Sequence, residues 1–274
     1  MRVALKIAYI GSAYHGFQVQ PDVPTIEGKI FEALEALEII EDPSSANFSS
    51  AGRTDAGVNA IGQVIAFDTE RSNLAIPRVI NSKLPKDIWA WAHAEVPADF
   101  HPRRYARSRT YRYIVPVEDH DISLIRSASQ ILLGTHDFAN FCVHEEGKCT
   151  TRTIKKIDVR LTDNLLKIDV EANSFLWKMV RKMVTAMMLV GSGERDMEWL
   201  KQMLQPEVYE EGLKPSFPYG LILMDVNYGD SVEWISDGYA IKRSSEKVQE
   251  YLRYHMVMAE VMKQFFPKEH QELD

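Results

Sequence analysis

Short stretches with the patterns of β-strands are the most numerous elements in this chain, and fewer stretches repeat at helical spacing. Strands are predicted for RVALKIAYI, ANFSSAG, GQVIAFDTE, DIWAWAHAEV, RTYRYIVPV and GLILMDVNY, and a hairpin turning at Asp163–Asn164 for TIKKIDVRLTDNLLKIDVEAN. The order strand, helix, strand, strand appears once on each side of about residue 105. We therefore expect an α+β fold of two α+β halves, residues 1–105 and 106–274, with mixed or antiparallel sheets and a central cleft.

Four stretches predict helices. The first starts after Thr25, a plausible N-cap, and the second is short, within IPRVINSKLP. The clearest runs from Ser174 to about Val190, where apolar residues, many of them methionines, recur at helical spacing before Gly191. The last extends from about Ser244 to Phe265, and the tail after it is acidic.

Composition limits the class of protein. With 45% hydrophobic and 26% charged residues, the 274-residue chain can bury a substantial core. Its net charge of −7 argues against a nucleic-acid binder that uses its whole surface, because phosphate affinity comes from clustered cations. The opening stretch turns polar too soon for a signal peptide, and no apolar run approaches a membrane span. We expect a soluble, cytoplasmic protein without a membrane partner.

The two cysteines do not predict a metal site. Cys142 and Cys149 flank VHEEGK, and with His144 they supply three of the four ligands that structural zinc needs. No second Cys or His pair completes the set, so ordinary reduced thiols are expected. No metal or small-molecule cofactor is predicted.

The basic residues are concentrated in one segment. HPRRYARSRTYRY contains Arg103, Arg104 and Arg109 among its five arginines, interleaved with tyrosines and without an acid. Arginine pairs with phosphates and tyrosine stacks on unpaired bases, so the mixture favours contact with RNA over a merely solvated basic strand.

Two other segments carry polar side chains with open roles. The loop GSAYHGFQVQPDVPT holds aromatic and amide residues, among them Gln18, that suit a planar polar ligand or a packed loop anchor. In the clearest helix, Lys178, Arg181 and Lys182 share a face opposite the methionines. Arg181 is either a surface arginine or one that reaches inward to a carboxylate.

The stretch AGRTDAGV has two glycines around Arg53 and Asp55. On its own it predicts a bend between strands, and an Asx-type turn explains Asp55 as well as chemistry does. If arginines lie nearby, they favour the ionised carboxylate, which suits nucleophilic or electrostatic work. Neither a metal-ligand pattern nor a phosphate-binding glycine pattern surrounds it.

Six motifs in order resemble those of the tRNA pseudouridine synthase A family, from the first residues to about residue 230. GRTDAGV resembles the family signature, usually GRTDAGVHA, and YHGFQVQP its opening loop. FHPRRYARSRTYRY is similar to the family's Phe-His-x-Arg and Tyr-x-Tyr strand. GTHDFANF, ANSFLWKMVRKMV and YGLILMDVNY are similar to the later motifs. The departures are Asn59, where the family usually has His, and Val19, where it usually has Arg.

The resemblance implies the pseudouridine synthase fold and an isomerase that converts uridine to pseudouridine in the anticodon stem-loop of tRNA, in the region of positions 38–40. It implies no cofactor or metal, and a homodimer. Asp55 matches the catalytic aspartate, Tyr111 the active-site tyrosine, and Arg181 the arginine that pairs with the aspartate. Leu221 matches the apolar residue packing the site, and Arg53 the residue that fills the space left by the flipped nucleotide.

The alternative is a catalytically silent RNA-binding or tRNA-folding protein on the same scaffold. The presence of Asp55, Tyr111 and Arg181 together favours the enzyme, because a binder needs the arginines but not this carboxylate. An aspartate-nucleophile hydrolase ranks last, since no supporting acid–base pair or metal ligands are evident. Tyr111 is expected to stack on the base and to be available as a general base.

Overall fold

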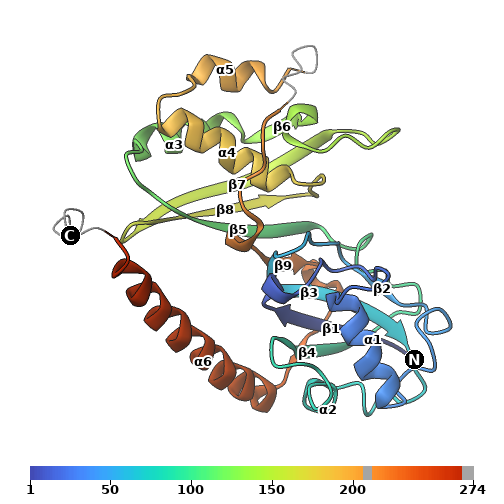
Figure 1. The fold of residues 1–274 in the computed structure, drawn as a ribbon. Coiled ribbons are helices and arrows are strands. Elements are labelled where there is room, and N and C mark those ends of the chain that lie inside the picture. Colours follow the sequence, from blue (N-terminus) through green and yellow to red (C-terminus); the bar gives the residue numbers. More distant parts are fainter. Residues whose placement is uncertain (206–211, 267–274) are drawn as a thin grey trace.

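The computed structural model describes residues 1–205 and 212–266 (Figure 1). The strands are β1 (Arg2–Tyr9), β2 (Ser49–Ser50), β3 (Asn59–Asp68), β4 (Ile88–Val96), β5 (Ser108–Pro116), β6 (Gly134–Asp137), β7 (Thr151–Thr162), β8 (Leu165–Ala172), β9 (Leu221–Asn227) and β10 (Ile235–Ser236). The helices are α1 (Ile26–Ala36), α2 (Pro77–Ile80), α3 (Ile122–Ile131), α4 (Met179–Gly191), α5 (Met197–Gln202) and α6 (Gly238–Lys263).

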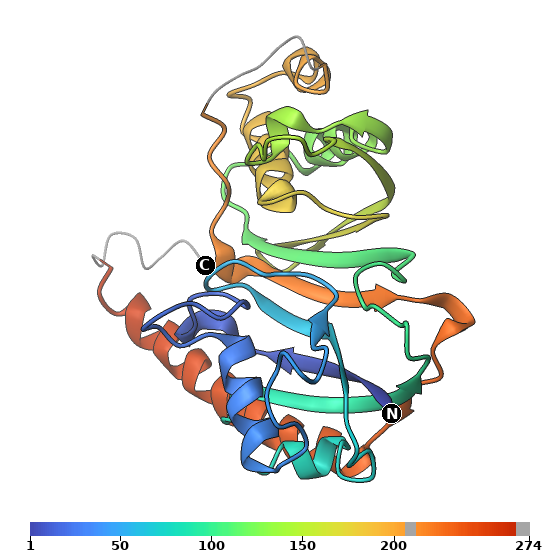
Figure 2. The ribbon, with the colours of Figure 1, turned by 90° about the vertical axis from the view of Figure 1, so that its right-hand side faces the viewer.

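One mixed sheet runs through both halves of the molecule (Figure 2). Its order is β10-β4-β1-β3-β9-β5-β8-β7-β6, with β2 beside β3. Neighbouring strands are antiparallel except β3 and β9, which pair in parallel at Asn59–Ile222 and Ala60–Leu223. This short parallel contact joins the two halves, and the predicted α+β class with a mixed sheet is confirmed.

Each half has its own hydrophobic core. The first packs α1 against β1, β3 and β4, and the second packs α3 and α4 against β5, β7 and β8. Tyr111 of β5 packs partly against both cores. A side chain at this position lies where the two halves meet.

The C-terminal segment returns to the first half. β10 pairs with His93 and Ala92 of β4, and α6 starts beside β4 and α2 before extending along the outside of the molecule (Figure 1). The division into residues 1–105 and 106–274 stays a prediction about folding units.

Local capping sets where the helices start. Thr25 accepts a hydrogen bond from the Gly28 amide at 3.2 Å, as its predicted N-cap role requires. The predicted start of the clearest helix was wrong by five residues, because Lys178 is left-handed (φ 62°) and α4 begins only after it. The start of the last helix was also wrong, because the side chain of Asp237 caps α6 from Gly238.

The hairpin turn was predicted at the right place, but two helices and two strands were missed. Asp163 has φ 53° between β7 and β8, which a small polar residue tolerates. The elements without a sequence prediction are α3, β6, α5 and β10. ANFSSAG contributes only the two-residue strand β2.

Candidate active site

A tight turn fixes the backbone at Asp55. The Asp55 carbonyl accepts a hydrogen bond from the Val58 amide at 3.2 Å, and Gly57 between them has φ 78°. Positive φ at the third residue is the mark of a type II turn, where glycine is preferred. A Cβ at Gly57 would also lie 3.2 Å from a ring carbon of Pro218. The predicted bend is therefore a turn that only a small, left-handed residue fits.

Hydrogen bonds from other segments anchor the loop around this turn. The hydroxyls of Thr54 and Tyr9 are 2.8 Å apart, and the Thr54 carbonyl accepts from the Phe17 amide at 3.0 Å. Gln63 of β3 donates to the Gly52 carbonyl at 2.8 Å. Three segments thus hold the backbone on both sides of Asp55, so the carboxylate is presented from a rigid base.

Each carboxylate oxygen of Asp55 has its own donor. Arg181 of α4 contacts Oδ2 through Nη1 at 2.8 Å, and the indole Nε1 of Trp177 donates to Oδ1 at 2.9 Å. The side chain of Arg181 is 10% exposed and that of Asp55 is 25% exposed. Arg181 also donates from Nε to the Ser216 carbonyl at 2.6 Å. Arg181 therefore reaches inward, and the pair spans the two halves of the molecule.

Trp177 was not predicted as a site residue. It stands four positions before Arg181 in SFLWKMVR, which could have marked it as a neighbour of the same carboxylate. Because Lys178 is left-handed, Trp177 lies outside the helix and its indole turns toward Asp55. Trp177 as a whole is still 48% exposed, so part of the residue faces solvent beside the carboxylate.

Tyr111 provides a neutral aromatic ring close to this pair. It packs edge-to-face on Phe175 with ring centroids 5.1 Å apart. Burial raises the pKa of Tyr111 to about 12, opposed by the positive charge of Arg109 and assisted by the negative charge of Asp55. The phenol is protonated at neutral pH, which suits stacking on a base better than accepting a proton.

Asn59 and Leu221 close the site on the side of the β3–β9 contact. Leu221 is buried at the start of β9, opposite Tyr113 of β5. The Asn59 amide nitrogen donates to the Tyr219 carbonyl at 2.8 Å, and its oxygen accepts from the Gly11 amide at 3.0 Å. Asn59 stands where the family usually has histidine. Its side-chain amide links the loops at Gly11 and Tyr219 to the start of β3.

A cleft of 640 Å³ lies beside the Asp55 loop. It brings together most of the side chains that were predicted to bind substrate, namely Gln18, Arg53, Arg103 and Arg104. His101 also lines it, and burial together with the nearby Arg104 lowers the pKa of its imidazole. Glu27 is the single acid among the lining residues, and burial raises its pKa. The cleft is therefore cationic at neutral pH.

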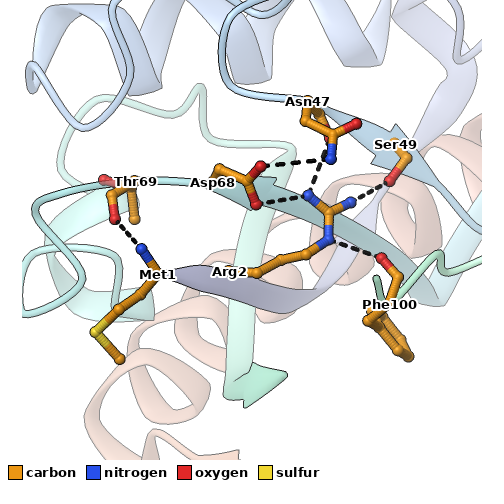
Figure 3. Close-up of polar contacts among 7 residues, drawn as sticks. All are labelled: Met1, Arg2, Asn47, Ser49, Asp68, Thr69 and Phe100. Atoms are coloured by element: carbon orange, nitrogen blue, oxygen red, sulfur yellow. Dashed lines mark hydrogen bonds and ion pairs between the residues drawn. The ribbon is translucent and has the colours of Figure 1, made fainter. Parts of the chain in front are cut away.

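The buried Arg2 holds the walls of this cleft together (Figure 3). It donates to the Phe100 carbonyl at 2.7 Å and to the Ser49 hydroxyl at 2.8 Å, and it pairs with Asp68 at 2.8 Å. Ser49 itself lines the cleft, and Phe100 precedes His101. One guanidinium thus connects strands β1, β2 and β3 to the start of the arginine-rich segment.

The arginine-rich segment divides by its position in the fold. Arg103 and Arg104 precede β5 and are exposed. Arg109 is buried in β5 and donates to the carbonyls of Ala51 and Arg103, each at 3.0 Å. Arg112 is paired with Asp169 at 2.6 Å. Within this segment, only the residues before β5 present free guanidinium groups. Arg109 instead holds the backbone of the Asp55 loop at Ala51 and that of the cleft wall at Arg103.

In the described ranges 1–205 and 212–266, no group of three or more His, Cys, Asp or Glu side chains lies close enough to hold a metal ion. Cys142 is buried and Cys149 is exposed, and both are free thiols. In the same ranges, no helix is both long and apolar enough to cross a membrane.

Comparison with known proteins gives consistent similarities. A family model described as tRNA pseudouridine synthase matches residues 128–229. A tRNA pseudouridine synthase A of Methanococcoides burtonii is 62% identical over 98% of this chain and 98% of that protein. The protein of the same name in Methanosarcina acetivorans is 58% identical over 98% of this chain and all of that protein. The one in Archaeoglobus fulgidus is 45% identical over 93% of this chain and 94% of that protein.

Proposed function

The chain belongs to the tRNA pseudouridine synthase A family and is an isomerase that acts on tRNA, and we propose that its target uridines lie in the anticodon stem-loop, in the region of positions 38–40. The location is proposed from the resemblance of the six motifs to the family, and the observation that supports the chemistry is Asp55, a carboxylate at the join of the two halves with a donor on each oxygen. Beside it lies the cationic cleft. We further propose that the enzyme works in the cytoplasm.

Asp55 is the proposed catalytic carboxylate. The reaction must break the bond between uracil N1 and the ribose, turn the base, and join C5 to the same ribose carbon. The target nucleotide leaves the stack first, which costs a few kcal/mol and is easiest in a loop or at the end of a stem. The ion pair with Arg181 holds the Asp55 carboxylate in one orientation, so that it can start the cleavage of the glycosidic bond.

The other site residues have supporting roles in this proposal. Tyr111 stacks on the flipped uracil, and its raised pKa favours this role over that of a general base. Leu221 packs below the base. Arg53, which is exposed at the edge of the cleft, occupies the space that the flipped nucleotide leaves in the RNA.

Release of tritium tests the activity directly. We expect the purified chain to release tritium from C5 of labelled uridine in tRNA without an added cofactor. The same tRNA with its anticodon-arm uridines changed to cytidine is the control and should release none. If tritium is released equally from both, the proposed location of the target is wrong. If it is released from neither, the chain is a silent RNA-binding protein.

The cleft is proposed to bind the tRNA backbone, and this predicts a salt-dependent loss of affinity. Replacing both Arg103 and Arg104 with Ala removes two exposed cations from one wall of the cleft. The Kd for tRNA should rise about tenfold, and the slope of log K against log salt should become shallower by about one to two. The matched control is Lys83→Ala with Lys86→Ala, two exposed cations on the loop before β4. Equal salt slopes for both double variants would show that the cleft does not bind phosphates.

We also propose that the enzyme is a homodimer that uses α6. The buried residues of this helix, Ala240 and Ser244, lie near its start, and the helix leaves apolar side chains more than a third exposed, among them Val248, Leu252, Met256, Val257 and Met262. An exposed apolar face of this size marks an interaction surface. Light scattering should give the mass of two chains for the wild type and of one chain for Leu252→Glu with Met256→Glu. A monomeric wild type contradicts the proposal.

A further inference from the structure

Two aromatic side chains outside the site described above stand in solvent next to it. Phe217 is 68% exposed and Tyr219 is 65% exposed. Their rings are stacked, with centroids 5.4 Å apart and an angle of 17° between their planes. Side chains of this size are seldom left in solvent as an ordered pair, since burial of either ring would be favourable.

The backbone that carries the two rings is firmly held. The buried Tyr113 donates its hydroxyl to the Phe217 carbonyl at 2.7 Å. Asn59 donates its side-chain amide to the Tyr219 carbonyl at 2.8 Å. Between them, Pro218 lies against Gly57. The rings are therefore exposed on a rigid segment, and the contacts that hold it use backbone atoms rather than the rings themselves.

The same segment is part of the active-site wall. Ser216, the residue before Phe217, accepts a hydrogen bond from Arg181, the partner of Asp55. Pro218 contacts the turn that presents Asp55, two residues from the carboxylate. In Figure 1 the segment enters β9 at the point where the two halves meet. A substrate held at Asp55 has its flanking parts within reach of the two rings.

We propose that Phe217 and Tyr219 form a stacking platform for an unpaired nucleobase of the tRNA that neighbours the flipped uridine. The proposal rests on the function proposed above. Flipping breaks the stacking of the uridine on both of its neighbours, so an unpaired neighbouring base is held less firmly in the loop and can turn out to meet the rings. An aromatic platform accepts any base on its outer face and contributes affinity without reading sequence. Continuity with the wall around Asp55 favours a base of the substrate over a separate protein as the occupant.

The first arm of the experiment removes the rings. Phe217→Ala with Tyr219→Ala should raise the Kd for unmodified tRNA about tenfold or more, because stacking on an aromatic side chain contributes that much per base. The ring-preserving pair, Phe217→Tyr with Tyr219→Phe, should stay within about twofold of the wild type. Tyr239→Ala, a 60% exposed tyrosine at the start of α6, is the matched control and should bind tRNA like the wild type.

The second arm identifies the base. Anticodon stem-loop RNAs with single abasic nucleotides on either side of the target are bound to the wild type and to the double alanine variant. At one position, removal of the base should weaken binding to the wild type about tenfold but leave binding to the variant almost unchanged. Such non-additivity shows that the missing base and the missing rings are partners. Additive losses at every position overturn the proposal.

The outcomes separate this proposal from the proposed function. If the wild type releases tritium but the double alanine variant binds tRNA as tightly as the wild type does, the platform is wrong and the function stands. If the wild type releases none, the function is wrong, while the abasic series still tests the platform. If the alanine pair changes the mass measured by light scattering and not the affinity for RNA, the rings are a protein contact and the platform is overturned.

Discussion

Asp55→Ala is expected to abolish tritium release from tRNA, and Asp55→Asn to lower kcat by at least about a thousandfold. The asparagine keeps the shape of the side chain, and its carbonyl oxygen can still accept the hydrogen bond from Trp177. It carries no charge to start glycosidic cleavage or to pair with Arg181. The measurement is single-turnover tritium release with enzyme in excess, so that slow release of product does not hide the chemical step.

Binding separates a catalytic role of Asp55 from a structural one. Both variants should bind tRNA within about tenfold of the wild type, because the cleft and the exposed arginines are unchanged. Asp163→Asn in the β7–β8 turn is the matched control, since an asparagine tolerates its φ of 53° and the site is remote. It should retain wild-type turnover. Wild-type turnover by Asp55→Asn would show that the carboxylate has no part in the reaction.

Most of the strands could be predicted from the sequence, because each has its own alternation or apolar run. The hairpin at Asp163 was found because a small polar turn separates two such runs. The strands β6 and β10 were missed since they have four and two residues, too few for a pattern to appear. The start of α4 was misplaced because helical spacing continues into residues 174–178, and a single left-handed residue ends the helix there.

The candidate site was harder to predict from short stretches of sequence than the strands were. Within its own stretch, Asp55 fits an Asx-type turn as well as an active site, and only the family motifs connected it with Arg181. Asp55, on the loop between β2 and β3, and Arg181, on α4, are 126 positions apart in the chain, so the fold alone sets the distance between them. Trp177 was missed for the same reason, since its indole meets Asp55 only because the backbone turns at Lys178.

The arginine-rich segment shows how the fold changes the meaning of a charge cluster. In the sequence its five arginines are equivalent, and all of them suit phosphate binding. In the structure, Arg109 points into the molecule from β5 and satisfies backbone carbonyls, whereas Arg112 is neutralised by Asp169. Alternation along a strand separates neighbouring side chains onto two faces, so a basic run that enters a strand cannot present all of its charge to one ligand.

Arg181→Met should lower kcat about a hundredfold and also destabilise the protein. The substitution leaves the indole of Trp177 as the hydrogen-bond donor to the Asp55 carboxylate and deprives the Ser216 carbonyl of the guanidinium. Breaking a well-buried pair costs about 3 to 5 kcal/mol, and because Asp55 is a quarter exposed we expect about 2 kcal/mol here. Denaturant unfolding measures the free energy of unfolding, and single-turnover tritium release measures kcat.

Three further variants identify the ion pair as the cause. Arg181→Lys keeps the charge but not the guanidinium that contacts Asp55 and Ser216 together. The losses of kcat and of stability should therefore both be smaller than for Arg181→Met. Arg160→Met removes a half-exposed arginine from β7 and should change stability little. Adding Asp55→Asn to Arg181→Met removes the unpaired charge and should recover part of the lost stability, although it leaves the enzyme inactive. If the double variant is less stable than Arg181→Met by the full effect of Asp55→Asn alone, the two side chains are not coupled, and Arg181 supports the fold without holding the carboxylate.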